Sequence, residues 1–140
     1  MPLPGSADSG GVSNHATSVF LVDDSTPVRE RLRELLSLES GIDVVGEADS
    51  AATAIEGIKC LRPAFVVLDF RLPDGTGLDV LRATGAADCH STFIVLSNHA
   101  SSQLRAACTA AGAQFFLDKS TEFDRLVFII AEANAAAKGH

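Results

Sequence analysis

The sequence predicts an α/β fold in which one parallel sheet of five strands is covered by helices on both faces. Short apolar runs recur along the 140 residues, and longer stretches with helical periodicity separate them. Three of the runs are unbroken blocks of four apolar residues, which is typical of strands buried on both faces in parallel sheets. Apolar residues make up 46% of the chain, enough for one buried core.

The five apolar runs are the expected strands. They span residues 19–22, 42–45, 65–68, 93–96 and 115–117. The second run contains the charged residue Asp43, so we expect that strand at an edge of the sheet.

The first helix is expected directly after the first strand. Thr26 and Pro27 form a favourable pair of N-cap and first-turn residue, and Gly41 ends the segment. The apolar residues between them recur on one helical face, at Val28, Leu32, Leu35 and Leu36.

Four further helices are expected between and after the remaining strands. Ser50 is a suitable cap for the second, which ends near Cys60, before Pro63. The third helix begins near residue 77, the fourth spans about 101–112, and the fifth spans about 122–138. The alternation predicts a doubly wound fold, for which we choose the flavodoxin-like (βα)5 strand order 2-1-3-4-5; the alternation alone does not fix that order.

The net charge of −7 disfavours nonspecific binding to nucleic acid, and we expect no direct nucleic-acid contact. The arginines at 29, 31 and 33 alternate with glutamates at 30 and 34, which is typical of a solvated helix face. The three cysteines, Cys60, Cys89 and Cys108, form no CxxC pair. We therefore expect buried or half-buried free thiols rather than disulfides or a zinc site.

Residues 1–17 are rich in Gly, Ser, Pro and Asp and read as a disordered leader to a domain at 18–140. They have neither the basic region nor the apolar core of a signal peptide, and no apolar run approaches the roughly 20 residues of a membrane span. A cytoplasmic protein is the expectation, and 140 residues leave no room for a second domain of ordinary size.

Polar residues follow four of the expected strands at their carboxyl ends, where parallel α/β sheets carry their sites. They are Asp23 and Asp24, then Asp69, Ser97, and Asp118 with Lys119. Clustered carboxylates attract Mg²⁺, a compact ammonium contacts phosphoryl oxygens, and an aspartate can be the nucleophile of phosphoryl transfer. Asp69 ends an apolar central strand and precedes a turn at 72–77, so it is the candidate nucleophile, whereas the adjacent pair Asp23 and Asp24 suits metal binding.

Four stretches resemble the receiver domains of two-component response regulators. They are residues 21–25 (LVDDS), 67–77 (VLDFRLPDGTG), 96–97 (LS) and 116–120 (FLDKS). The resemblance covers about 18–138, and its most specific part is Asp69-x-x-x-Pro-x-x-x-Gly together with the acidic pair upstream.

The resemblance implies a role for each site residue. Asp69 is the phosphoacceptor, Ser97 and Lys119 contact the phosphoryl oxygens, and Phe116 is an aromatic switch residue that turns inward with Ser97. Mg²⁺ is bound by Asp24, Asp23, Asp69 and the backbone carbonyl of Arg71.

The implied partners are a histidine kinase or a histidine phosphotransfer protein, and a downstream protein that the sequence does not identify. The surface of the fourth helix, fifth strand and fifth helix is implied as the output surface, where a homodimer is one candidate. The apolar run 126–130 is broader than one helix face needs, so it either packs on the sheet or adds an exposed patch there. Residues 42–48 are most similar to receivers that often carry a helix-turn-helix output domain, which these 140 residues do not include.

Three positions depart from the family pattern. Ser120 stands where many receivers have a proline after the lysine, so a cis peptide is not assumed. Asn98 replaces a small residue, and Arg71 lies two residues after the acceptor; both bear on the lifetime of the phosphorylated state.

Three other functions compete with this interpretation. A phosphatase of the haloacid-dehalogenase type needs a second aspartate at the position of Arg71, and a dinucleotide-binding domain needs a glycine-rich turn where residues 23–27 contain no glycine. A receiver that binds partners without phosphorylation stays open, although every acceptor-site residue type is present. Asp74, considered by itself, is predicted to be an ordinary turn residue.

Overall fold

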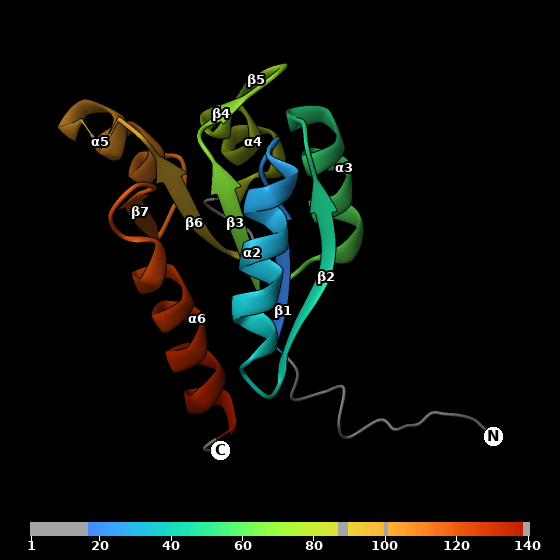
Figure 1. Cartoon of the computed structure of the whole chain (residues 1–140). Helices are drawn as coiled ribbons and strands as arrows, with labels where there is room; N and C mark the ends of the chain where they lie inside the picture. The colour runs from blue at the N-terminus through green and yellow to red at the C-terminus, as the bar shows by residue number, and fades with distance from the viewer. Residues whose placement is uncertain (1–16, 87–89, 100, 139–140) are drawn as a thin grey trace.

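The computed structural model describes residues 17–86, 90–99 and 101–138 of the chain, and its sheet confirms the predicted α/β fold. The sheet contains β1 (Thr17–Val22), β2 (Ile42–Ala48), β3 (Phe65–Asp69), β6 (Thr92–Ser97) and β7 (Phe115–Asp118). All pairings are parallel, and the order is β2-β1-β3-β6-β7, which is the predicted order 2-1-3-4-5 (Figure 1). The strand that carries Asp43 lies at one edge, as expected.

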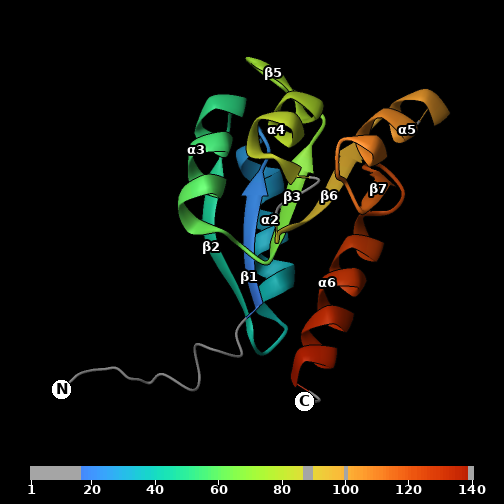
Figure 2. The ribbon, with the colours of Figure 1, turned by 180° about the vertical axis from the view of Figure 1, so that it is seen from behind.

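Helices cover both faces of the sheet. One face carries α2 (Thr26–Ser37) and α6 (Phe123–Lys138), and the other carries α3 (Ala51–Leu61), α4 (Gly77–Thr84) and α5 (Ser102–Ala110), as Figures 1 and 2 show from opposite sides. Each face has its own buried cluster. A small antiparallel hairpin, β4 (Arg71–Leu72) with β5 (Gly75–Thr76), follows β3 where the sequence predicted only a turn.

The first helix begins differently from its prediction. Ser25, not Thr26, is the N-cap, and its hydroxyl accepts a hydrogen bond from Val28 N at 3.4 Å. Thr26 and Pro27 are the first two helical residues, where a proline without an N–H costs no hydrogen bond. The predicted cap Ser50 does cap α3, and Ser101 caps α5.

The predicted leader lies largely outside the described residues, because 1–16 are not described. Thr17, predicted as the last leader residue, is instead the first residue of β1. Its buried hydroxyl donates to Asn134 Oδ1 at 2.9 Å, and Asn134 Nδ2 donates to the carbonyl of Ser40 at 2.8 Å. These bonds tie the start of the sheet to α6.

The cysteine prediction holds in part. Cys60 and Cys108 are both free; Cys108 is buried, but Cys60 is exposed. The buried positions of α3 are Ala51, Ala54 and Ile58, so a residue two positions after Ile58 points away from the sheet. Cys89 lies outside the described residues.

The apolar run of α6 combines both of its interpretations. Leu126 and Ile130 are fully buried against the sheet, whereas Phe128 is 63% exposed. Over the described ranges, none of the helices has the length and hydropathy that a membrane span requires.

Candidate functional site

The carboxyl edge of the sheet brings the predicted polar residues together. Asp23 and Asp24 follow β1, Asp69 ends β3, Ser97 ends β6, and Lys119 follows β7. A cavity of about 220 Å³ opens at this edge. Its lining consists of Asp24, Asp69, Phe70, Arg71, Ser97, Asn98 and Lys119.

Three carboxylates at this edge form a cluster that suits a divalent cation. One oxygen from each of Asp23, Asp24 and Asp69 lies within 4.8 Å of the others. Asp23 is 2% exposed, and its buried Oδ2 lies beside the ammonium of Lys119. Because buried carboxylate oxygens need a compensating charge and Mg²⁺ prefers oxygen ligands, these residues fit a magnesium ion.

Lys119 supplies the positive charge inside the cluster. Its Nζ lies 2.7 Å from Asp23 Oδ2 and 3.1 Å from Asp69 Oδ2. Burial lowers the pKa of Lys119, but its hydrogen bond to Asp23 and the charges of Asp23 and Asp69 outweigh this, so the pKa is raised overall. The side chain therefore stays an ammonium at neutral pH and offsets part of the negative charge.

Asp69 is held in an unfavourable setting for a carboxylate. Burial, followed by the charge of Asp23, raises the pKa of Asp69, and the charge and hydrogen bond of Lys119 offset this only in part. The backbone N–H of Arg71 also donates to the Asp69 carboxylate. A metal ion beside these oxygens relieves the repulsion that raises the pKa.

The last glycine of the acceptor motif has a steric explanation. A Cβ at Gly77 would lie 3.3 Å from the backbone oxygen of Asp69 and 3.3 Å from Leu68 Cγ. Gly77 N also donates to the carbonyl of Phe70 at 2.7 Å. The chain thus returns close to the end of β3, which keeps Asp69 at the rim of the cavity.

Ser97 is tied to the loop that follows β6. Its hydroxyl accepts from His99 N at 3.0 Å and donates to the His99 carbonyl at 3.2 Å. The side chain is 3% exposed and lines the same cavity as Asp69. To donate to another oxygen, this hydroxyl has to give up the bond to the His99 carbonyl.

Phe116 is buried on the neighbouring strand β7, with 5% of its surface exposed. The guanidinium of Arg105, from α5, lies 5.1 Å from the centre of the ring. Arg105 Nη1 also donates to the backbone oxygen of Phe116 at 2.8 Å. Sequence reasoning missed this partner, because Arg105 gives no local signal of its target 11 residues further on.

The Lys119–Ser120 peptide is trans, since the described segments contain no cis peptide. Ser120 N and Ser120 Oγ both donate to Asp118 Oδ1, at 2.9 and 2.6 Å. These two bonds lower the pKa of Asp118. Ser120 thus shapes the loop with hydrogen bonds where a proline would have none to donate.

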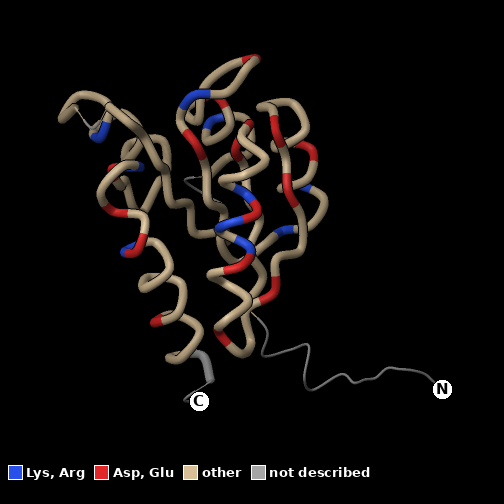
Figure 3. The backbone as a smooth tube through the Cα atoms, viewed as in Figure 1, with Lys and Arg blue, Asp and Glu red and all other residues tan. Residues whose placement is uncertain are grey.

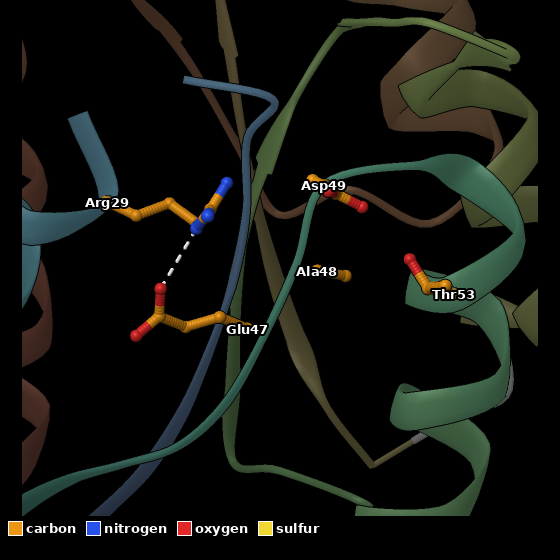
Figure 4. A pocket seen from close by; sticks show the side chains of 5 residues that line it. All are labelled: Arg29, Glu47, Ala48, Asp49 and Thr53. Carbon is orange, nitrogen blue, oxygen red and sulfur yellow. Dashed lines mark hydrogen bonds and ion pairs between the residues drawn. The ribbon is translucent and has the colours of Figure 1, made fainter. Parts of the chain in front are cut away.

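Arg29 corrects one prediction from the sequence. Basic and acidic positions do alternate along α2 (Figure 3), but Arg29 is not a solvated residue, since its side chain is only 15% exposed. Its Nη1 donates to the backbone oxygen of Asp23, and its Nε pairs with Glu47 Oε1 at 2.9 Å (Figure 4). Arg33, one helical turn further on, contacts the other oxygen of Glu47.

Asp74 lies in the turn between β4 and β5, as predicted, but its carboxylate also contacts the start of α3. Its Oδ1 accepts from Ala51 N at 2.6 Å and its Oδ2 from Ala52 N at 3.0 Å, both at the start of α3. These bonds, with that of Ala51 the larger, lower the pKa of Asp74. The partners are 23 and 22 residues away, so no local pattern could have identified them.

Comparisons with known proteins agree on one family. The family model described as response regulator receiver domain matches residues 19–131. The DNA-binding transcriptional activator DevR/DosR of Mycobacterium tuberculosis is 34% identical over 117 residues, 84% of this chain and 54% of that protein. The chain therefore spans about half the length of that relative.

Two further similarities concern a shorter protein and a solved structure. The chemotaxis protein CheY of Thermotoga maritima is 29% identical over 109 residues, which are 78% of this chain and 90% of that protein. The crystal structure of a two-component response regulator of the LuxR family from Aurantimonas sp. SI85-9A1 has a TM-score of 0.77 and 30% identity, with 86% of each chain covered.

Proposed function

The chain belongs to the family of response regulator receiver domains, and on that premise we propose that Asp69 accepts a phosphoryl group in the presence of Mg²⁺. The donor is the phosphohistidine of a histidine kinase or a histidine phosphotransfer protein. One observation carries the proposal: oxygens of Asp23, Asp24 and Asp69 lie within 4.8 Å of one another. The ammonium of Lys119 contacts two of these carboxylates.

The proposed reaction moves the phosphoryl group from nitrogen to oxygen. A carboxylate oxygen of Asp69 forms a bond to phosphorus while the bond from phosphorus to the donor imidazole breaks. The imidazole nitrogen leaves with the electron pair and regains a proton from water. Asp23, Asp24, Asp69 and the carbonyl of Arg71 would hold Mg²⁺, which would supply positive charge to the phosphoryl oxygens.

Lys119 and Ser97 have distinct parts in stabilising the product. The Lys119 ammonium exchanges its contact with Asp69 for a contact with a phosphoryl oxygen. Only a small movement is needed, because the ammonium already lies 3.1 Å from Asp69 Oδ2. The Ser97 hydroxyl leaves the carbonyl of His99 and donates to a second phosphoryl oxygen. The chain is then a signalling phosphoacceptor that catalyses its own phosphorylation and slow hydrolysis, rather than an enzyme with a separate substrate.

The phosphorylated state is read through a shift in conformational equilibrium. Movement of Ser97 changes the end of β6, which pairs with β7 beside Phe116. The output surface is formed by α5, β7 and α6, and Phe128 adds an exposed apolar side chain on α6. A downstream protein or a second copy of the chain binds this surface in the proposed mechanism.

Intact-mass measurement tests the chemistry directly. The wild type is incubated with acetyl phosphate and Mg²⁺, beside Asp69→Asn and a sample with excess chelator. The expected result is a gain of one phosphoryl group in the wild type with Mg²⁺ alone. If the wild type binds Mg²⁺ but gains no phosphoryl group, the chain is a receiver that acts by docking without phosphorylation.

A further inference from the structure

The short β4–β5 hairpin carries one side of the proposed metal site, and the buried side chain of Leu72 anchors one of its strands in the core. Its ladder consists of two residue pairs, Arg71 with Thr76 and Leu72 with Gly75. In Figure 1 the hairpin projects beyond the carboxyl edge of the sheet. Arg71 contributes to the site, because it lines the same cavity as Asp69 and its carbonyl is the proposed metal ligand. The position of this short hairpin therefore matters for the site.

Contacts with neighbouring helices fasten the hairpin at its base and at its tip. At the base, Thr76 N donates to Asp79 Oδ2 of α4 at 2.9 Å. At the tip, the Asp74 carboxylate accepts from Ala51 N at 2.6 Å and from Ala52 N at 3.0 Å. The first N–H groups of a helix have no partner within the helix, and a carboxylate there is favoured by the helix dipole.

The link at the tip is not needed merely to cap the helix. Ser50 already caps α3, since its Oγ accepts from Thr53 N at 3.2 Å. Asp74 bonds two different N–H groups of the same helix end, from a hairpin more than 20 residues away in the sequence. What Asp74 adds is a fixed distance between α3 and the hairpin.

We propose that Asp74 is a positioning residue for magnesium binding: by fastening the β4–β5 hairpin to α3, it holds the backbone of Arg71 beside Asp69. The inference rests on the proposed function, because it assumes that the acidic cluster binds Mg²⁺. Asp74 itself touches neither the metal nor the phosphoryl group. Its effect is transmitted through the backbone of Leu72 and Pro73, the two residues between Asp74 and Arg71.

The test measures Mg²⁺ affinity by isothermal titration calorimetry on the whole chain. Asp74→Ala is expected to raise the dissociation constant for Mg²⁺ by roughly 10-fold. This is the lower end of the range for losing a residue that orients a metal ligand. Asp74→Asn keeps one accepting oxygen and is expected to fall between Asp74→Ala and the wild type. Ser50→Ala is the matched control, because it weakens the same end of α3 without touching the hairpin.

A kinetic readout separates positioning from a general loss of structure. With acetyl phosphate, Asp74→Ala is expected to be phosphorylated slowly at low Mg²⁺ and at the wild-type rate once Mg²⁺ is saturating. A fold-wide defect would lower the rate at every Mg²⁺ concentration. Circular dichroism melting curves establish that each variant is folded at the assay temperature.

Three outcomes would overturn the inference, and they are distinguishable. If the wild type binds Mg²⁺ and is phosphorylated while Asp74→Ala binds Mg²⁺ equally well, the inference alone is wrong. If Ser50→Ala weakens Mg²⁺ binding as much as Asp74→Ala does, the integrity of α3 is what matters. If the wild type itself neither binds Mg²⁺ nor gains a phosphoryl group, the proposed function fails and the inference with it.

Discussion

Phe20 of β1 packs so closely on Gly57 of α3 that a Cβ at position 57 would lie 2.6 Å from the ring's Cζ. The same ring faces Gly46 of β2, where a Cβ would lie 2.7 Å from Cε1. One aromatic ring thus occupies the space of two absent side chains on two different elements. This contact sets how closely α3 approaches the sheet, and α3 in turn holds the hairpin beside the acceptor.

Gly57→Ala is therefore expected to destabilise the protein, although alanine favours helices by about 1 kcal/mol over glycine. Overpacking against a buried ring costs about 1–3 kcal/mol, which exceeds that gain. Urea denaturation followed by circular dichroism measures the change. Glu56→Ala, at the neighbouring position of α3, is the control, and Phe20→Leu in the Gly57→Ala background should recover part of the loss. A Gly57→Ala variant more stable than the wild type would contradict the packing argument.

The strands and the acceptor site were predictable because both produce patterns among residues that are close together in the sequence. Buried strands such as β3 are continuous apolar runs, and the carboxyl end of each strand is simply the next residue, so Asp69 and Ser97 could be assigned to one edge. The contacts that position the site produce no such local pattern. Arg29 with Glu47 and Asp74 with Ala51 join segments 18 and 23 residues apart, and only the packing of α2 and α3 on the sheet brings them together.

Lys119→Met should separate metal binding from phosphorylation. The Nζ of Lys119 lies 2.7 Å from Asp23 Oδ2 and competes with Mg²⁺ for that oxygen, so the variant should bind Mg²⁺ at least as tightly as the wild type. Without the ammonium, phosphorylation by acetyl phosphate should slow by roughly 100-fold, as when one charge-stabilising donor is removed. Calorimetry and intact-mass time courses measure the two effects. Loss of Mg²⁺ binding in Lys119→Met would mean that the lysine organises the cluster instead of competing for it.

Asp69→Asn should stabilise the fold when no divalent cation is present. Burial and the charge of Asp23 raise the pKa of Asp69 in the folded state, so the ionised side chain weakens folding at neutral pH. A neutral isostere removes this cost. The melting temperature with chelator should rise in the variant, whereas the increase produced by Mg²⁺ should be smaller than in the wild type. Asp43→Asn, at an exposed aspartate of the edge strand β2, controls for the general loss of a negative charge. Equal Mg²⁺ effects in wild type and Asp69→Asn would argue against Asp69 as a ligand.

Arg105 should stabilise the buried position of Phe116. Its guanidinium lies 5.1 Å from the ring centre, and such a contact contributes about 0.5–1 kcal/mol. A double-mutant cycle of Arg105→Ala and Phe116→Leu isolates the ring contact, because the hydrogen bond to the backbone oxygen of residue 116 remains available in Phe116→Leu. Gln103→Ala, an exposed change on the same helix, should show no coupling to Phe116→Leu. Coupling near zero for Arg105 would mean that the ring is held by the core alone.

The pH dependence of stability should report the Asp74 link. Hydrogen bonds from Ala51 N and Ala52 N lower the pKa of Asp74 in the folded protein. The folded state then binds this proton less readily than the unfolded chain, in which an aspartate titrates at about 3.9. The contribution of Asp74 is therefore complete above that value and is lost as the pH falls through the lower folded pKa. The difference in unfolding free energy between wild type and Asp74→Asn should be constant from about pH 8 to about pH 5 and shrink below about pH 4. Urea denaturation over this range measures it, and a difference that grows towards low pH would show that the Asp74 carboxylate is not held as an anion by α3.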